Sequence, residues 1–127
     1  MRVFSTGFSN GAFFSSLLGC TMADRFAAIA PVSGGTLRVP CQPSRGVPVL
    51  IHHGRTDELI PVEVGRAGRD AWVAVDACKE SESEGCERHH ACRDGAVVEY
   101  CEGDQEHTWP AQATGRIWKF LMEHPKP

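Results

Sequence analysis

The sequence lacks an apolar run near the roughly 18 residues that a membrane-spanning helix requires. It also lacks a basic excess, because 13 lysines and arginines stand against 16 aspartates and glutamates, for a net charge of -3. Internal repeats, low-complexity segments and interdomain linkers are absent too. These absences argue against a membrane or a nucleic acid as a partner, and they predict one domain over residues 1–127.

Residues 1–7 do not show the basic segment and sustained apolar stretch of a secretory signal, and they read as a strand that enters a turn. The chain nevertheless holds six cysteines, an even number that favours disulfides and an oxidising compartment. We therefore expect a secreted or periplasmic location.

The cysteines can pair in many ways, and sequence alone does not select among them. We favour Cys20 with Cys41, Cys78 with Cys92, and Cys86 with Cys101. The alternative is a zinc site that combines cysteines with His89 or His90, but the sequence has no C-x-x-C pair. The expectation is therefore no metal and no cofactor.

Short apolar runs alternate with segments of helical period along the chain. Strand character is found at residues 2–6, 26–32, 47–53 and 96–102. Helices are predicted from 10 to about 22, from about 64 to 77 and after Pro110. Residues 33–46 and 78–95 are predicted to be irregular, the latter held by cross-links. The fold class is α/β, with about four mainly parallel strands and three helices.

A G-x-S-x-G sequence lies between the first predicted strand and the first predicted helix, at Gly7-Phe8-Ser9-Asn10-Gly11. In a nucleophile elbow, the chain turns sharply and lifts a serine hydroxyl above the sheet edge. The bare pattern also fits a Gly/Ser turn at the start of a helix. Its position between a strand and a helix favours Ser9 as a nucleophile.

A catalytic serine needs a histidine base and a carboxylate that orients the histidine. Asp57 follows the third predicted strand and His107 follows the fourth, so both belong to the sheet edge that presents Ser9. The order Ser, Asp, His is that of α/β-hydrolases. Glu58 is a neighbouring alternative to Asp57, and the competing histidines are His52, His53, His89, His90 and His124.

Four segments resemble successive motifs of the secreted polyhydroxybutyrate depolymerase and feruloyl esterase family of α/β-hydrolases. They are residues 7–12, 24–32, 53–57 and 107–110, and the resemblance extends over most of residues 1–110. It implies a serine carboxylic ester hydrolase with Ser9 as nucleophile, Asp57 as orienting acid and His107 as base. The implied substrates are short-chain esters, feruloyl or acetyl esters of plant polysaccharide, and polyester oligomers.

The chain departs from this family in two places. Gly103 is followed by Asp104-Gln105-Glu106, where family members usually have a glycine-rich approach to the histidine. The resemblance also starts at the nucleophile strand, so the usual oxyanion pair is represented here by the backbone N–H of Asn10 alone. The expected architecture is thus a partial, truncated α/β-hydrolase.

A truncated sheet would leave the strand at residues 2–6 as an open edge. We expect a second copy to cover it in a homo-oligomer, and a neighbouring subunit could supply the second oxyanion donor. Trp109 and Phe8 are predicted to line an acyl pocket, although ordinary packing would also explain them. The alternative function is a catalytically impaired remnant that acts as a binding or interaction domain.

Overall fold

The alternation of strands and helices is present in the computed structural model, which describes residues 1–35 and 40–126. The strands are β1 (Phe4–Phe8), β2 (Ala28–Val32), β3 (Val49–Gly54), β4 (Glu80–Glu84), β5 (Cys86–His90) and β6 (Val98–Gly103). The α-helices are α1 (Asn10–Thr21), α2 (Val62–Val75) and α3 (Ala113–Glu123), and a 3-10 turn covers Arg93–Gly95. The three predicted helices are confirmed.

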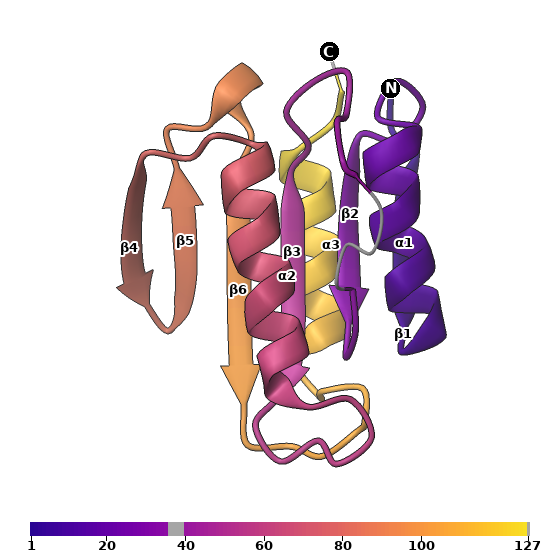
Figure 1. Ribbon diagram of the computed structural model, residues 1–127, viewed down its shortest axis with the longest axis vertical. Coiled ribbons are helices and arrows are strands. Elements are labelled where there is room, and N and C mark those ends of the chain that lie inside the picture. The colour runs from indigo at the N-terminus through magenta and orange to yellow at the C-terminus, as the bar shows by residue number, and fades with distance from the viewer. Residues whose placement is uncertain (36–39, 127) are drawn as a thin grey trace.

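The strands form one mixed sheet in the order β1-β2-β3-β6-β5-β4 (Figure 1). The strands β1, β2, β3 and β6 are parallel, and helices α1 and α2 follow β1 and β3. The strands β5 and β4 extend the sheet in antiparallel fashion. The predicted α/β class is therefore right, but the prediction of about four strands is wrong, because the described residues form a sheet of six.

The two additional strands lie in residues 78–95, which the sequence predicted to be irregular. Strand β4 has the sequence Glu-Ser-Glu-Ser-Glu and is exposed at every position, so it carries no apolar alternation that would mark a strand. Backbone pairing with β5 holds it instead, and Gly85 connects the two strands with a φ of 87°, which favours glycine.

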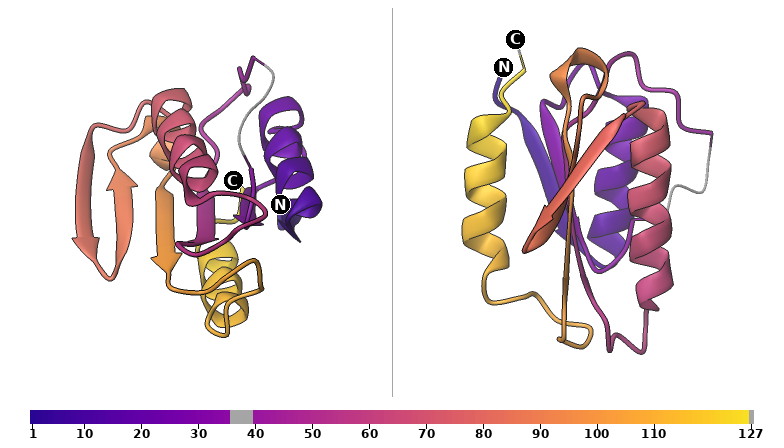
Figure 2. Two further views of the ribbon diagram at one scale, coloured as in Figure 1. Left: turned by 60° about the horizontal axis from the view of Figure 1, so that its bottom comes forward. Right: turned by 90° about the vertical axis from the view of Figure 1, so that its left-hand side faces the viewer.

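Helices cover both faces of the sheet (Figure 2). Helices α1 and α2 pack on one face, over a core that includes Ile29, Val49, Ile51 and Trp72. Helix α3 packs on the other face with Ile117 and Phe120, over a second set of strand residues, Ala28, Ala30, Val32 and Leu50. Because side chains alternate along a strand, the continuous apolar runs of β2 and β3 serve both cores.

The first strand is shifted from its prediction, from residues 2–6 to Phe4–Phe8. The sequence predicts that the strand stops at Gly7, but Gly7 pairs with Pro31 inside the ladder. A Cβ at Gly7 would overlap the backbone of Gly11, so glycine is needed there because strand and helix approach each other closely. The strand consequently runs up to Ser9.

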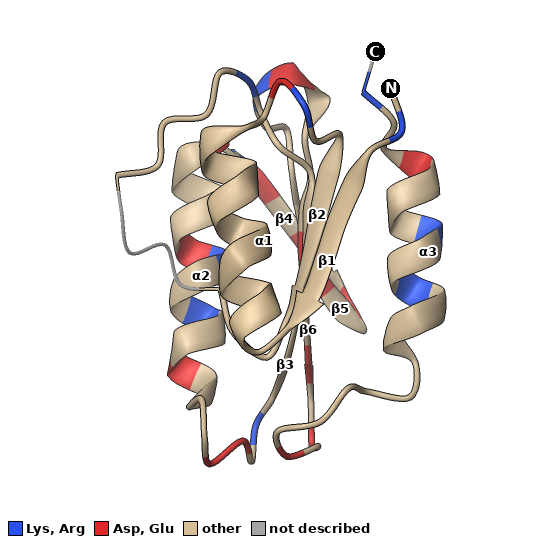
Figure 3. Cartoon of the chain, turned by 90° about the vertical axis from the view of Figure 1, so that its right-hand side faces the viewer, with Lys and Arg blue, Asp and Glu red and all other residues tan. Residues whose placement is uncertain are grey.

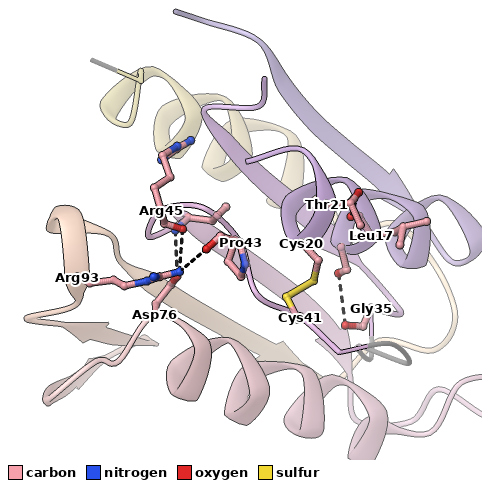
Figure 4. The surroundings of a disulfide bond; sticks show 11 residues. Leu17, Cys20, Thr21, Gly35, Cys41, Pro43, Arg45, Asp76 and Arg93 are labelled. Carbon is pink, nitrogen blue, oxygen red and sulfur yellow. Dashed lines mark hydrogen bonds between the residues drawn. A yellow bond between two sulfur atoms is a disulfide. The ribbon is translucent and has the colours of Figure 1, made fainter. Parts of the chain in front are cut away.

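All three favoured cysteine pairings are present as disulfides. Cys20–Cys41 joins α1 to the connection between β2 and β3, of which residues 36–39 lie outside the described residues (Figure 4). No free cysteine is found among the described residues, so the alternative zinc site has no thiolate ligands there. That same part of the chain has no group of three or more His, Cys, Asp or Glu side chains suited to a metal ion.

None of the described helices is both long enough and apolar enough to cross a membrane.

Candidate active site

Ser9, Asp57 and His107 follow the carboxyl ends of three parallel strands, β1, β3 and β6. Parallel strands end at the same edge of a sheet, which is the lower edge in Figure 1. Strands β3 and β6 are paired, with Gly54 opposite Gly103, so the loops that carry Asp57 and His107 leave the sheet side by side. Strand β1 lies beyond β2, on the other side of β3.

Ser9 occupies a strained turn between β1 and α1. Its φ of 56° and ψ of -112° lie outside the regions that a serine ordinarily adopts. The Ser9 N–H donates to the Val32 carbonyl at 2.9 Å, which ties the turn to β2, and the Ser9 carbonyl accepts the N–H of Ala12 at 2.9 Å. These are the backbone features of a nucleophile elbow.

His107 and Asp57 form a short hydrogen bond, with 2.7 Å between His107 Nδ1 and Asp57 Oδ2. The Asp57 side chain is fully buried, and that of His107 is 15% exposed. The second oxygen, Asp57 Oδ1, accepts the backbone N–H groups of Leu59 at 2.9 Å and Ile60 at 2.8 Å. Both carboxylate oxygens are thus satisfied inside the protein.

The pKa of Asp57 is set by opposing influences. Burial favours the neutral acid, but the hydrogen bonds from Ile60, His107 and Leu59 outweigh burial and lower the pKa of Asp57 below its ordinary value. An ionised Asp57 can only accept hydrogen bonds, so a neutral His107 carries its proton on Nδ1. The lone pair of His107 Nε2 is then free to accept a proton.

The remaining contact at this edge involves the rings of Phe8 and His107, whose centroids are 4.7 Å apart. This packing brings the residue next to Ser9 against the histidine. Among the described interactions, the Ser9 hydroxyl makes no hydrogen bond to His107. The structure therefore joins Asp57 to His107 directly and places Ser9 at the same sheet edge without joining it to the histidine.

The other predicted site residues also lie at this edge. Asn10 is the first residue of α1, so its N–H is one of those without a carbonyl acceptor inside the helix. The Trp109 indole N–H donates to Thr114 Oγ1 at 3.0 Å, and its ring is partly exposed, as is that of Phe8. Leu59, which sequence reasoning did not select, is 73% exposed two residues after Asp57. No pattern in the sequence marks it.

Among the competing histidines, His53 also lies near Asp57. His53 is fully buried behind Asp57, where its Nε2 lies 2.7 Å from the Ile60 carbonyl and 3.7 Å from Asp57 Oδ2. Burial, and next the charge of Arg116, lower the pKa of His52 to about 4, so His52 is neutral at physiological pH. The remaining histidines contact hairpin glutamates or the C-terminal helix, namely His89, His90 and His124.

No family model matches the chain. Among curated proteins, the chain is similar to feruloyl esterase D of Neurospora crassa, with 35% identity over 82 residues, which are 65% of this chain and 28% of that protein. It is also similar to feruloyl esterase B of Piromyces equi, with 26% identity over 145 aligned positions that cover 85% of this chain and 26% of that protein. The chain thus spans little more than a quarter of these two relatives.

Solved structures with this fold include esterase PE8, with a TM-score of 0.67 and 21% identity over 95% of this chain and 49% of that one. Another is an acetyl xylan esterase from Aspergillus awamori, with a TM-score of 0.64 and 18% identity over 94% of this chain and 59% of that one. The chain is therefore similar in sequence to part of these feruloyl esterases, and similar in fold to part of these solved structures.

Proposed function

We propose that the protein is a serine carboxylic ester hydrolase with Ser9 as nucleophile, His107 as general base and Asp57 as the orienting acid. The observation that carries this proposal is the 2.7 Å bond between a buried, ionised Asp57 and His107, at the sheet edge where a strained turn presents Ser9. An elbow serine and a histidine held by a carboxylate are the parts that acyl transfer through a serine requires.

The reaction proceeds in two stages. His107 Nε2 takes the proton from the Ser9 hydroxyl while Ser9 Oγ bonds to the ester carbonyl carbon; the ester C–O bond then breaks and His107 protonates the leaving alcohol. Water next attacks the acyl-serine carbonyl with His107 again as base; the bond from the acyl carbon to Ser9 Oγ then breaks, His107 returns the proton to Ser9 Oγ, and the carboxylic acid leaves. The N–H of Asn10 stabilises the oxyanion, and the loss of one donor of a pair costs about 10²-fold to 10³-fold in turnover.

Feruloyl esters are the proposed substrate class, because the curated relatives are named feruloyl esterases. Phe8 packs its ring against His107, and Phe8 and Trp109 are both partly exposed, which suits an aromatic acyl group. Hydrolysis of methyl ferulate, methyl acetate and a hydroxybutyrate oligomer, compared as kcat/KM, tests this choice. A higher value for either non-aromatic ester would contradict it.

A fluorophosphonate probe tests the nucleophile. Ser9 Oγ bonds to phosphorus as fluoride leaves, and intact-mass measurement detects the adduct. We expect labelling of the wild type and of Ser33→Ala but not of Ser9→Ala. Ser33 is a matched control because it also has a positive φ, of 58°, at the end of the neighbouring strand. An unlabelled wild type would favour the binding-domain alternative, and labelled Ser9→Ala would refute the nucleophile.

The rate should fall on acidification. The lowered pKa of Asp57 keeps that carboxylate ionised, and an imidazolium at position 107 could not accept the proton of Ser9. A profile of kcat/KM between about pH 5 and 8 measures this fall. A flat profile would contradict the role of His107.

The three disulfides support a proposed location in an oxidising compartment, outside the cytosol.

A further inference from the structure

The loop that follows β3 and carries Asp57 is called the acid loop here, and the loop that follows β6 and carries His107 is called the base loop. Two hydrogen bonds connect these loops. The backbone N–H of Arg55 donates to the Gly103 carbonyl at 2.8 Å. The hydroxyl of Thr56 donates to the Asp104 carbonyl at 3.0 Å. Each bond joins a residue just before Asp57 to a residue shortly before His107.

Side-chain charges reinforce this connection. The Arg55 guanidinium contacts Asp104 Oδ1 through Nε at 2.9 Å and through a terminal nitrogen at 2.7 Å. Its other terminal nitrogen donates to Glu102 Oε2 at 3.3 Å. Asp104, which departs from the glycine-rich approach expected before His107, therefore has Arg55 as its partner.

Glu102 anchors the arrangement from β6. Its side chain is mostly buried and accepts two hydrogen bonds from Arg66, at 2.8 and 2.9 Å, and one from the Tyr100 hydroxyl at 2.7 Å. The Arg66 hydrogen bonds, opposed by burial and supported by Tyr100 and Arg55, lower the pKa of Glu102 to about 2. Glu102 thus offers Arg55 a fixed negative charge.

We propose that Arg55 and Asp104 are positioning residues. They hold the acid loop and the base loop together and thereby keep Asp57 and His107 correctly placed relative to each other. This inference rests on the proposed hydrolase function. Exposed ion pairs add little to folding stability, whereas a displacement of about 1 Å at a catalytic group can cost about 10²-fold in rate. The pair therefore acts on turnover rather than on stability.

Arg55→Ala tests the proposal against Arg88→Ala as a matched control. Arg88 also bonds a glutamate, Glu99 at 3.1 Å, and its side chain is 43% exposed compared with 45% for Arg55. We expect kcat to fall about 10-fold in Arg55→Ala, with KM within about 2-fold, and no change in Arg88→Ala. Asp104→Asn should lower kcat in the same direction and serves if Arg55→Ala does not fold. Equal kcat in all three variants and the wild type would overturn the proposal.

A double-mutant cycle separates positioning from general damage. Asp57→Asn already removes the orienting carboxylate, so a weaker connection between the two loops should lower kcat little further. Arg55→Ala should then cost less than about 2-fold in the Asp57→Asn background. A full 10-fold loss in that background would show that Arg55 acts independently of Asp57.

A proton NMR measurement needs no turnover. We expect the proton in the short hydrogen bond between His107 Nδ1 and Asp57 to give a far-downfield signal. Arg55→Ala should shift or broaden this signal, and Arg88→Ala should not. This result together with an unlabelled wild type would refute the hydrolase proposal but keep the positioning role. An unchanged signal in Arg55→Ala would refute the positioning role even if the wild type is an active esterase.

Discussion

The parallel part of the sheet and its antiparallel hairpin are built in different ways. Strands β2 and β3 are buried at every position between helices on both faces. Hairpin strand β4 is exposed at every position, and β5 is only half-buried. Disulfides hold the hairpin in place of a core: Cys86–Cys101 ties it to β6, and Cys78–Cys92 closes its base.

Every residue of the candidate site lies in or beside the parallel part, and none lies in the hairpin. Packed strands fix the positions from which loops start, which is what a catalytic arrangement requires. The hairpin has histidine–carboxylate pairs of its own, such as His90 with Glu80 at 3.3 Å, but it lacks the burial that surrounds Asp57. Histidine–carboxylate pairs therefore occur in both parts of the sheet, but the proposed catalytic pair is the one that packed strands bury and hold in place.

The largest effect should come from Asp57→Asn, compared with Glu80→Gln in the hairpin. Each removes the charge of a carboxylate that lies close to a histidine Nδ1, at 2.7 Å for Asp57 and 3.3 Å for Glu80. We expect kcat to fall by about 10³-fold to 10⁴-fold in Asp57→Asn, because His107 loses its tautomer and orientation, and to stay unchanged in Glu80→Gln. Steady-state ester hydrolysis measures both, and a loss below about 10-fold in Asp57→Asn would refute the comparison.

A pH effect should arise where the two parts meet. Asp76, at the end of α2, accepts the Val47 N–H through Oδ1 at 2.9 Å, and its backbone carbonyl accepts the Arg93 N–H at 2.9 Å. Its Oδ2 has no hydrogen-bond partner. Burial is the main influence, and it raises the pKa of Asp76 to about 7 despite the Val47 bond and nearby arginines.

Because its pKa is raised on folding, Asp76 stays protonated in the folded state at pH values where it is ionised in the unfolded chain. Stability should therefore fall as pH rises from about 4 to 7, by on the order of 1 kcal/mol per pH unit. Asp76→Asn should flatten this dependence in chemical denaturation, since an amide oxygen still accepts from Val47. Asp70→Asn, exposed on the same helix, is the control. A slope unchanged in Asp76→Asn would contradict the assignment.

The hairpin disulfide should matter for stability and not for turnover. Cys78–Cys92 spans 14 residues, and its removal by Cys78→Ser with Cys92→Ser should lower the free energy of unfolding by about 3 kcal/mol. We expect faster hydrogen exchange in β4 and β5 and an unchanged kcat. A drop in kcat as large as the effect of Arg55→Ala would show that the hairpin supports the site after all.

The sequence predicted those elements whose burial produces a pattern of apolar residues. Apolar runs revealed the four parallel strands, and the positions of Ser9, Asp57 and His107 just after three of those strands predicted one shared edge. It failed for β4, whose Glu and Ser residues show no apolar period because that strand is exposed at every position and pairs with β5 through its backbone. The contact of Arg55 with Asp104 was equally invisible, since it depends on which loops the sheet brings together.

The outer edges of the sheet show the same contrast. Strand β4 has three glutamates, a common protection against edge-to-edge pairing, whereas neither β1 nor the adjacent α1 has a charged residue (Figure 3). Large apolar side chains are exposed on and near β1 and α1, namely Met1, Val3, Phe8, Phe14, Leu17 and Met22. We propose that a second copy of the chain covers this edge, with the two β1 strands related by a twofold axis.

Light scattering at micromolar concentration tests the proposed dimer, for which we expect the smallest effect of a substitution. We expect a homodimer for the wild type and a shift toward monomer for Thr6→Lys, because a lysine on an exposed edge strand opposes strand addition. Ser83→Lys on β4 should leave the molecular mass in solution unchanged, since the β4 edge already carries charge and is not the edge proposed to pair with a second copy. A monodisperse wild-type monomer would contradict the dimer. A dimer lost in Ser83→Lys but kept in Thr6→Lys would assign the pairing to the charged edge.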